Sequence, residues 1–150
     1  MPARVDRFGR DVVKQIDSGV TIRGLYAPAR YSRSVSVARI VNHIQVGNAF
    51  RKQVAGLERP DVILVCMPLV ELAHEAVRYG RENGIPVVVD LRDLWPDVWL
   101  EPVPAFLRPL AKAGMVPWNR MLSRALRDCD AISGITDSII DWGLRRAGRE

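Results

Sequence analysis

The residues best suited to chemistry lie in one short segment, VVVDLRDLWPDVWLEP, at positions 87–102. Valines typical of a buried strand run into charged residues and indoles: Asp90, Arg92, Asp93, Trp95, Asp97, Trp99 and Glu101. Carboxylates can accept or orient a proton, and the guanidinium fork suits a carboxylate or a phosphate. Two interpretations stay open. The segment is a functional edge, or it is a junction in which Asp93 or Asp97 caps a helix, Arg92 pairs with a carboxylate and the indoles pack.

The elements that must position this segment alternate along the chain. Short apolar runs predict strands at residues 20–26, 61–67, 85–91 and 130–135. Helical spacing predicts helices at residues 36–56, 69–83, 105–127 and 137–147. In the second helix the apolar residues share one side, and Glu71 is placed on the polar side. The alternation predicts an α/β fold, with a Rossmann-like parallel sheet and helices on both faces.

This architecture locates the candidate site. Ligands of open parallel sheets bind beyond the carboxyl ends of the strands. Residues 87–89 should therefore be core, and the chain from Asp90 onward should emerge at the binding edge. Pro68 follows the preceding strand, and Ser133 and Thr136 follow the last one, so these residues should border the same edge. Thr136 or Asp137 is also a suitable N-cap for the final helix.

Charge is unevenly distributed along the 150 residues, whose formal net charge is +5. Positions 18–57 and 102–127 contain no acidic residue, and the acids concentrate in positions 90–101. A basic surface attracts nucleic acid, phosphorylated substrates or anionic lipid, and a merely solvated basic face is the alternative. No aromatic-lined strand motif or helix-turn-helix is recognisable, so we expect no nucleic-acid partner.

The acid-free stretch AFLRPLAKAGMVPWNRMLSRALR combines apolar and basic residues. Such a segment can lie in the headgroup layer of an anionic membrane. The residues expected to face the membrane are Arg108, Lys112, Trp118, Arg120 and Arg124. Pro109, Gly114 and Pro117 argue against one continuous helix, and a packed crossover helix is the competing interpretation.

The remaining patterns indicate a cytoplasmic protein, with peripheral attachment to the inner face of the cell membrane as the accompanying hypothesis. No apolar run approaches the ~20 residues of a membrane span, and the first residues do not resemble a signal peptide. Cys66 and Cys129 each lie beside an apolar run, which predicts buried free thiols. Asp128 and Asp130 fit an Asp-x-Asp pattern but lie at a helix–strand junction, so we expect no metal site. His43 and His74 have no paired ligand spacing and are expected on a helix surface or in the core.

Several segments carry a family resemblance. Positions 60–101, PDVILVCMPLVELAHEAVRYGRENGIPVVVDLRDLWPDVWLE, resemble the amino-terminal half of a family 4 glycosyltransferase of the GT-B fold. Arg92 to Pro96 match the Arg-Asp-Leu-Trp-Pro signature of a subgroup that builds bacterial surface polysaccharides. Positions 18–44 and 124–148 are similar to the preceding segment and to the last strand and helix of that domain.

The resemblance implies transfer of a sugar, with retained anomeric configuration, from a nucleotide-sugar donor to a glycan or lipid-linked acceptor. It places this chain on the acceptor side, with Asp93 near the acceptor hydroxyl and Arg92 fixing that carboxylate or binding an acceptor phosphate. Helix capping is the rival role for Asp93. The acceptor-binding residues are then Asp90, Trp95, Asp97, Glu101, Pro68, Ser133 and Thr136. No cofactor is implied beyond the donor.

The resemblance also implies missing parts. The family has an additional first strand with a Gly-rich turn and a second, donor-binding domain, and we expect this chain to be a partial domain, inactive alone. Without that strand, the strands at residues 20–26 and 61–67 must either pair directly or leave unpaired edges, and we expect poor solubility or oligomerisation. The alternative function is a non-catalytic α/β module that binds a protein partner or an anionic membrane surface.

Overall fold

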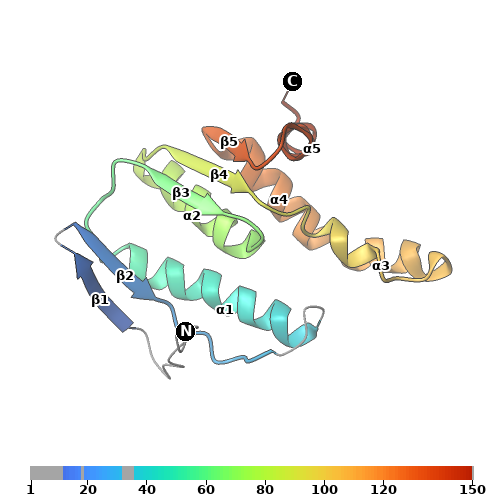
Figure 1. Cartoon of the computed structure of the whole chain (residues 1–150), viewed down its shortest axis with the longest axis horizontal. Helices are drawn as coiled ribbons and strands as arrows, with labels where there is room; N and C mark the ends of the chain where they lie inside the picture. Colours follow the sequence, from blue (N-terminus) through green and yellow to red (C-terminus); the bar gives the residue numbers. More distant parts are fainter. Residues whose placement is uncertain (1–11, 18, 32–35, 150) are drawn as a thin grey trace.

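The computed structural model describes residues 12–17, 19–31 and 36–149 of the chain (Figure 1). Strands and helices alternate through most of it, and a parallel sheet packs against helices. The predicted α/β class is therefore confirmed. The predicted strand and helix positions agree with the observed elements to within a few residues, apart from the long 105–127 segment.

The parallel sheet has three strands, β3 (Ile63–Cys66), β4 (Val87–Leu91) and β5 (Ala131–Gly134), in the order β3-β4-β5. Cys66 pairs in register with Asp90, and Asp90 pairs with Ser133. Helix α2 (Val70–Asn83) connects β3 to β4, and α4 (Val116–Asp128) leads into β5. The carboxyl ends of the three strands consequently meet at one edge.

The helices next to the sheet cover one of its faces, and the expected coverage of both faces is not found in the described residues. Strands that follow one another in chain order through right-handed crossovers return each helix to the same side. Helix α5 (Asp137–Ala147) follows the same rule, because a Cβ atom on its Gly143 would meet Leu91 at 2.4 Å and Ile132 at 3.4 Å. A second covered face would need a reversal of the strand order.

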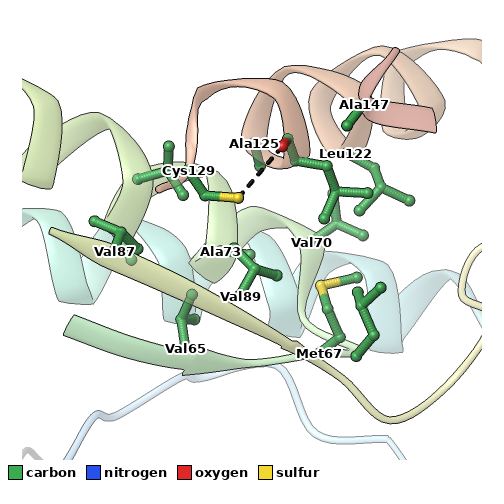
Figure 2. Close-up of a cluster of buried hydrophobic side chains, with 14 of the residues drawn as sticks. Val65, Met67, Val70, Ala73, Val87, Val89, Leu122, Ala125, Cys129 and Ala147 are labelled. Atoms are coloured by element: carbon green, nitrogen blue, oxygen red, sulfur yellow. Dashed lines mark hydrogen bonds between the residues drawn. The ribbon is translucent and has the colours of Figure 1, made fainter. Parts of the chain in front are cut away.

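The hydrophobic core fills the space between this face and helices α2, α4 and α5 (Figure 2). Val65, Val87 and Val89 project from the strands toward Ala73 of α2 and Leu122 of α4. The thiol of Cys129 donates to the Leu126 carbonyl at 3.3 Å and is buried, as predicted. These contacts fix the sheet and, with it, the loops at its carboxyl edge.

The opposite face of the sheet is open in the described residues. Leu64 is 63% exposed, and Cys66 on the same side is exposed, so the prediction of a buried Cys66 thiol is wrong. Strand β3 is also an edge strand, with β4 as its only described partner. An unpaired edge is the feature from which oligomerisation was predicted, and that outcome stays a prediction. The exposed apolar face is an additional reason to expect it.

The predicted strand at residues 20–26 exists, but it is not part of the parallel sheet. Strand β2 (Val20–Gly24) pairs with β1 (Val12–Asp17) as a separate antiparallel hairpin. Four apolar side chains of the hairpin are more than half exposed: Val13, Ile16, Val20 and Ile22. The hairpin therefore adds a second exposed apolar region.

Helix α1 (Val37–Val54) packs against α2 rather than against the sheet. It begins at Ser36, whose hydroxyl accepts a hydrogen bond from the Arg39 amide at 3.2 Å. Gly47 permits a close approach, because a Cβ atom there would lie 3.2 Å from the backbone of Glu71. This approach brings the inner side of α1 next to the first turn of α2.

Residues 97–128 form several short helices instead of one: η1 (Asp97–Leu100), η2 (Ala105–Leu107), α3 (Arg108–Gly114) and α4. Pro109 and Pro117 lie in the first turns of α3 and α4, where a missing amide hydrogen costs little. Helix α3 projects away from the sheet (Figure 1). Among the described helices, none combines the length and the apolar character that crossing a membrane requires.

Candidate functional site

The carboxyl edge of the sheet is built on one row of side chains from the three strands. Asp90 accepts hydrogen bonds from Ser133 at 2.9 Å and from the Cys66 thiol at 3.5 Å. Arg92 Nε also donates a hydrogen bond to Asp90, at 2.6 Å. The Arg92 hydrogen bond, helped by that of Ser133, holds the pKa of Asp90 below its usual range. Both Asp90 oxygens are thus committed to holding strands together, which limits any contact of Asp90 and Ser133 with an acceptor.

Arg92 uses only part of its guanidinium group in this row. Its Nε atom binds Asp90, which confirms the expected pairing with a neighbouring carboxylate, while 61% of the side chain stays exposed. Asp90 therefore fixes the direction of the guanidinium group, whose side chain also interacts with Cys66. A planar fork held in this way can bind an incoming phosphate or carboxylate in two-point fashion.

Asp93 is half-buried, and within the described residues its carboxylate has no hydrogen-bond or ion-pair partner. It caps no helix, because η1 begins after Pro96 and has no side-chain cap. The capping role expected as its rival is therefore not found for Asp93. Its lone pairs remain available to a ligand at the carboxyl edge of β4.

Trp95 and Pro96 are buried, and a cis peptide bond joins them. Only 2% of Trp95 is exposed, and its ring meets Trp99 edge to face at a centroid distance of 4.4 Å. The indole therefore works as an internal packing group, contrary to its expected contact with an acceptor. Packing of the indoles was one of the two interpretations of the sequence, and it is the one observed for Trp95.

Asp97 is occupied by contacts with α5. Both of its oxygens accept from Arg146, at 2.6 and 2.5 Å, and Oδ2 also accepts from the Trp142 indole at 3.0 Å. The carboxylate therefore ties η1 to the last helix, and neither capping nor acceptor binding describes it. Glu101 is exposed in the loop that follows η1. Only Glu101 of these two stays open to a ligand.

Pro68 and Thr136 lie at the ends of β3 and β5, as predicted. Pro68 is half-buried between β3 and α2. The hydroxyl of Thr136 accepts from the Ile139 amide at 3.4 Å and caps α5, which was the alternative role for this residue. The open polar groups of the edge are therefore those of Arg92, Asp93 and Glu101.

Of the residues predicted to face the membrane, four are exposed and one is turned inward. Arg108, Lys112, Arg120 and Arg124 are exposed. Trp118 instead turns inward, and its indole donates to the Glu71 carboxylate at 2.7 Å. Trp118 is therefore removed from the candidate membrane surface.

The apolar residues available for membrane contact are instead exposed side chains in and next to helix α3. Phe106 is 80% exposed and Leu110 is 73% exposed. Sequence reasoning did not single them out, although both lie in the acid-free stretch beside the prolines that break the helix. We call Phe106, Leu107, Leu110 and Lys112 the α3 tip.

The Asp-x-Asp pair has structural contacts, and no group of three or more metal-ligating side chains occurs in the part of the chain that is described. Asp128 forms an ion pair with Arg81 at 3.0 Å, and Asp130 accepts from the Val87 amide at 2.7 Å. Both carboxylates therefore stabilise the junction before β5.

Comparisons with known proteins give no match: no family model, curated protein or solved structure is significantly similar to this chain.

Proposed function

We propose that this chain forms the acceptor side of a retaining family 4 glycosyltransferase of the GT-B type. The enzyme transfers a sugar from a nucleotide-sugar donor to a lipid-linked acceptor in the synthesis of bacterial surface polysaccharide. The strongest support for this proposal is that the segment from Arg92 to Pro96, RDLWP, has an open part and a buried part. Trp95 and Pro96 are buried, while Arg92 and Asp93 stay open beyond the carboxyl end of β4, where parallel sheets bind ligands.

Two of the open residues, Asp93 and Arg92, have a role in this proposal. The Asp93 carboxylate orients the acceptor hydroxyl and accepts its proton, because no described side chain occupies its oxygens. Arg92 is held by Asp90 through Nε and binds an acceptor phosphate through its terminal nitrogens. The family resemblance assigns most donor contacts to a second domain, so the proposal for these residues concerns the acceptor.

The catalytic part is tested with the complete native polypeptide, a set of nucleotide sugars and polyprenyl-diphosphate-linked sugars as acceptors. Asp93→Asn should lower kcat by roughly a hundredfold or more, the range of a lost acid–base group. Asp141→Asn, which changes an exposed aspartate of α5, is the matched control and should leave kcat unchanged. A D93N enzyme with normal kcat would contradict the role of Asp93.

The acceptor part is tested on the chain itself, by calorimetric titration with a short-chain polyprenyl phosphate. Arg92→Gln should weaken binding on the order of tenfold to a hundredfold, as expected for charge-assisted hydrogen bonds. Arg145→Gln, at an exposed arginine of α5, should bind normally. Equal binding by R92Q and the unchanged chain argues against a phosphate site at this edge.

A second candidate function is binding to an anionic membrane surface, favoured by the α3 tip. Phe106 and Leu110 are largely exposed on a helical segment that projects from the fold (Figure 1). The exposed side of α4 adds positive charge. A groove of about 410 Å³ on this helix is lined by Val116, Asn119, Arg120, Ser123, Arg124 and Arg127. Apolar insertion together with positive charge is the pattern of interfacial membrane binding.

Co-sedimentation with vesicles of phosphatidylglycerol or of phosphatidylcholine tests this candidate. The double substitution Phe106→Ser and Leu110→Ser should abolish sedimentation, while Leu57→Ser, an apolar residue exposed elsewhere, should not. Replacing Arg120 and Arg124 by Gln should cost about 1 kcal/mol per arginine with anionic vesicles only. Binding that ignores lipid charge contradicts the proposal.

A further inference from the structure

Helices α1, α2 and α4 meet around a buried polar chain. His43 of α1 is 2% exposed and Glu71 of α2 is 5% exposed, although Glu71 was expected on the polar side of its helix. Arg39 Nε donates to His43 Nε2 at 3.3 Å. His43 Nδ1 faces Glu71 Oε2 at 3.8 Å, and Glu71 Oε1 accepts from Trp118 at 2.7 Å. The chain therefore crosses from one helix to the next through side chains.

The donor from Arg39 determines the tautomer of His43. A guanidinium N–H can only donate, so Nε2 must be an unprotonated acceptor. The neutral ring then carries its proton on Nδ1, which faces the Glu71 carboxylate. Burial, together with the positive charge of Arg39, lowers the pKa of His43 and favours this neutral form.

The same side chains surround Trp95 in the RDLWP segment. The His43 ring lies edge-on to the Trp95 indole at a centroid distance of 5.9 Å. The Arg39 guanidinium carbon lies 5.2 Å from the Trp95 ring centroid and 5.9 Å from that of Tyr31. Three buried polar atoms here have no hydrogen-bond partner among the described residues: His43 Nδ1, Glu71 Oε2 and Trp95 Nε1. Such atoms are costly to bury, which makes this place sensitive to any change of charge.

We propose that His43 and Glu71 form a pH-responsive support for the loop that carries Trp95. Protonation would place a hydrogen on His43 Nε2, which would then oppose the Arg39 N–H and put two cations side by side. Arg39 would have to leave His43 and its position over Trp95. Among the described residues, the charged and titratable groups around His43 are Arg39 from α1, Glu71 from α2 and Tyr31 from the segment after β2. Of these described groups, only Glu71 favours the imidazolium. The inference does not depend on the proposed enzyme activity.

The two titratable groups have opposite effects on stability. An unfolded histidine has a pKa near ~6.5, and that of His43 is lower, so the unfolded chain binds more protons below that pH. His43 therefore reduces stability as the pH falls below ~6.5. Burial raises the pKa of Glu71 against the opposing Trp118 hydrogen bond, so Glu71 adds stability as the pH falls through its native pKa. The pH dependence of the unfolding free energy is the sum of these two opposite effects. A residue-specific measurement is therefore needed.

Long-range proton–nitrogen NMR of the imidazole rings provides that measurement, because the chain has two histidines. We expect His43 as the Nδ1–H tautomer, with a titration midpoint below the ~6.5 of an unfolded histidine. The Trp95 indole signal should shift with the midpoint of His43. An Nε2–H tautomer, a His43 midpoint at or above ~6.5, or a Trp95 signal that does not change with the titration of His43 would each overturn the proposal.

Two substitutions separate the parts of the network. His43→Gln should remove the pH dependence of the Trp95 signal, and the matched control His74→Gln should retain it. If H43Q fails to fold, Glu71→Gln gives a second test. Removing the carboxylate that faces His43 should move the His43 midpoint to lower pH, and an unchanged midpoint would show that the two residues are not coupled.

Discussion

The two ends of the Arg92–Asp97 segment have different surroundings. At one end, Arg92 and Asp93 keep most of their polar atoms open at the carboxyl edge of the sheet. At the other, Trp95 is buried against Trp99 and His43, and Asp97 is bonded to Arg146 and Trp142. One short segment thus contains an open part and an anchored part.

The difference shows how an exposed loop can hold a rigid position. Contacts from α1 and α5 fix the anchored part, and the hydrogen bond between Arg92 and Asp90 fixes the beginning of the loop. The open part is then carried between two fixed points. A ligand site needs such support, because polar groups act only when they are held in place.

The largest expected effect is at the centre of the anchored part. Trp95→Ala should lower the free energy of unfolding by about 3–5 kcal/mol, because it empties a fully buried aromatic site. Trp99→Ala, at a half-buried ring, should cost clearly less. Urea denaturation followed by circular dichroism measures both. Equal losses for the two variants would contradict the division of the segment.

A smaller effect is expected where two aspartates of the segment are compared. Asp97→Ala removes an ion pair and an indole hydrogen bond, and should cost about 1–2 kcal/mol at this partly exposed position. Asp93→Ala should change stability by less than ~0.5 kcal/mol, because no described partner is lost. The same denaturation experiment applies. A D93A loss as large as that of D97A would show that Asp93 is also anchored.

The smallest effect on stability is expected at the second open region, the uncovered face of the sheet. Leu64→Lys should alter the free energy of unfolding by less than ~0.5 kcal/mol, because this side chain is largely exposed. It should nevertheless reduce self-association, measured by light scattering across a concentration series. Self-association that persists in L64K would point to the β1–β2 hairpin instead.

Local sequence patterns predicted much of the framework. Helix α5 was predicted with its observed bounds, because Thr136 is a capping residue and the apolar residues of the helix follow from Ile139. The prolines correctly indicated a broken helix between residues 105 and 127. Burial of Cys66 was wrong, and coverage of both sheet faces is not found in the described residues, because a strand sequence does not reveal how many faces will be covered.

The candidate site was only partly predictable for the same reason. The position of Asp90 to Glu101 at a sheet edge followed from the valine run and the alternation of elements. That Glu71 would be buried did not follow, since its partner Trp118 lies 47 positions away in the sequence. Distant partners leave no mark in local periodicity.

The amino-acid sequence by itself determined the α/β alternation, the parallel strands and the segment at their carboxyl edge, because periodicity, caps and prolines act over a few residues. Only the tertiary structure decided which carboxylates are occupied. Asp97 is paired with Arg146 across 49 positions, and Asp90 with Ser133 across 43. Asp93, in the same segment, was left open. Such assignments depend on which helices and strands come together, and that is a property of the folded chain.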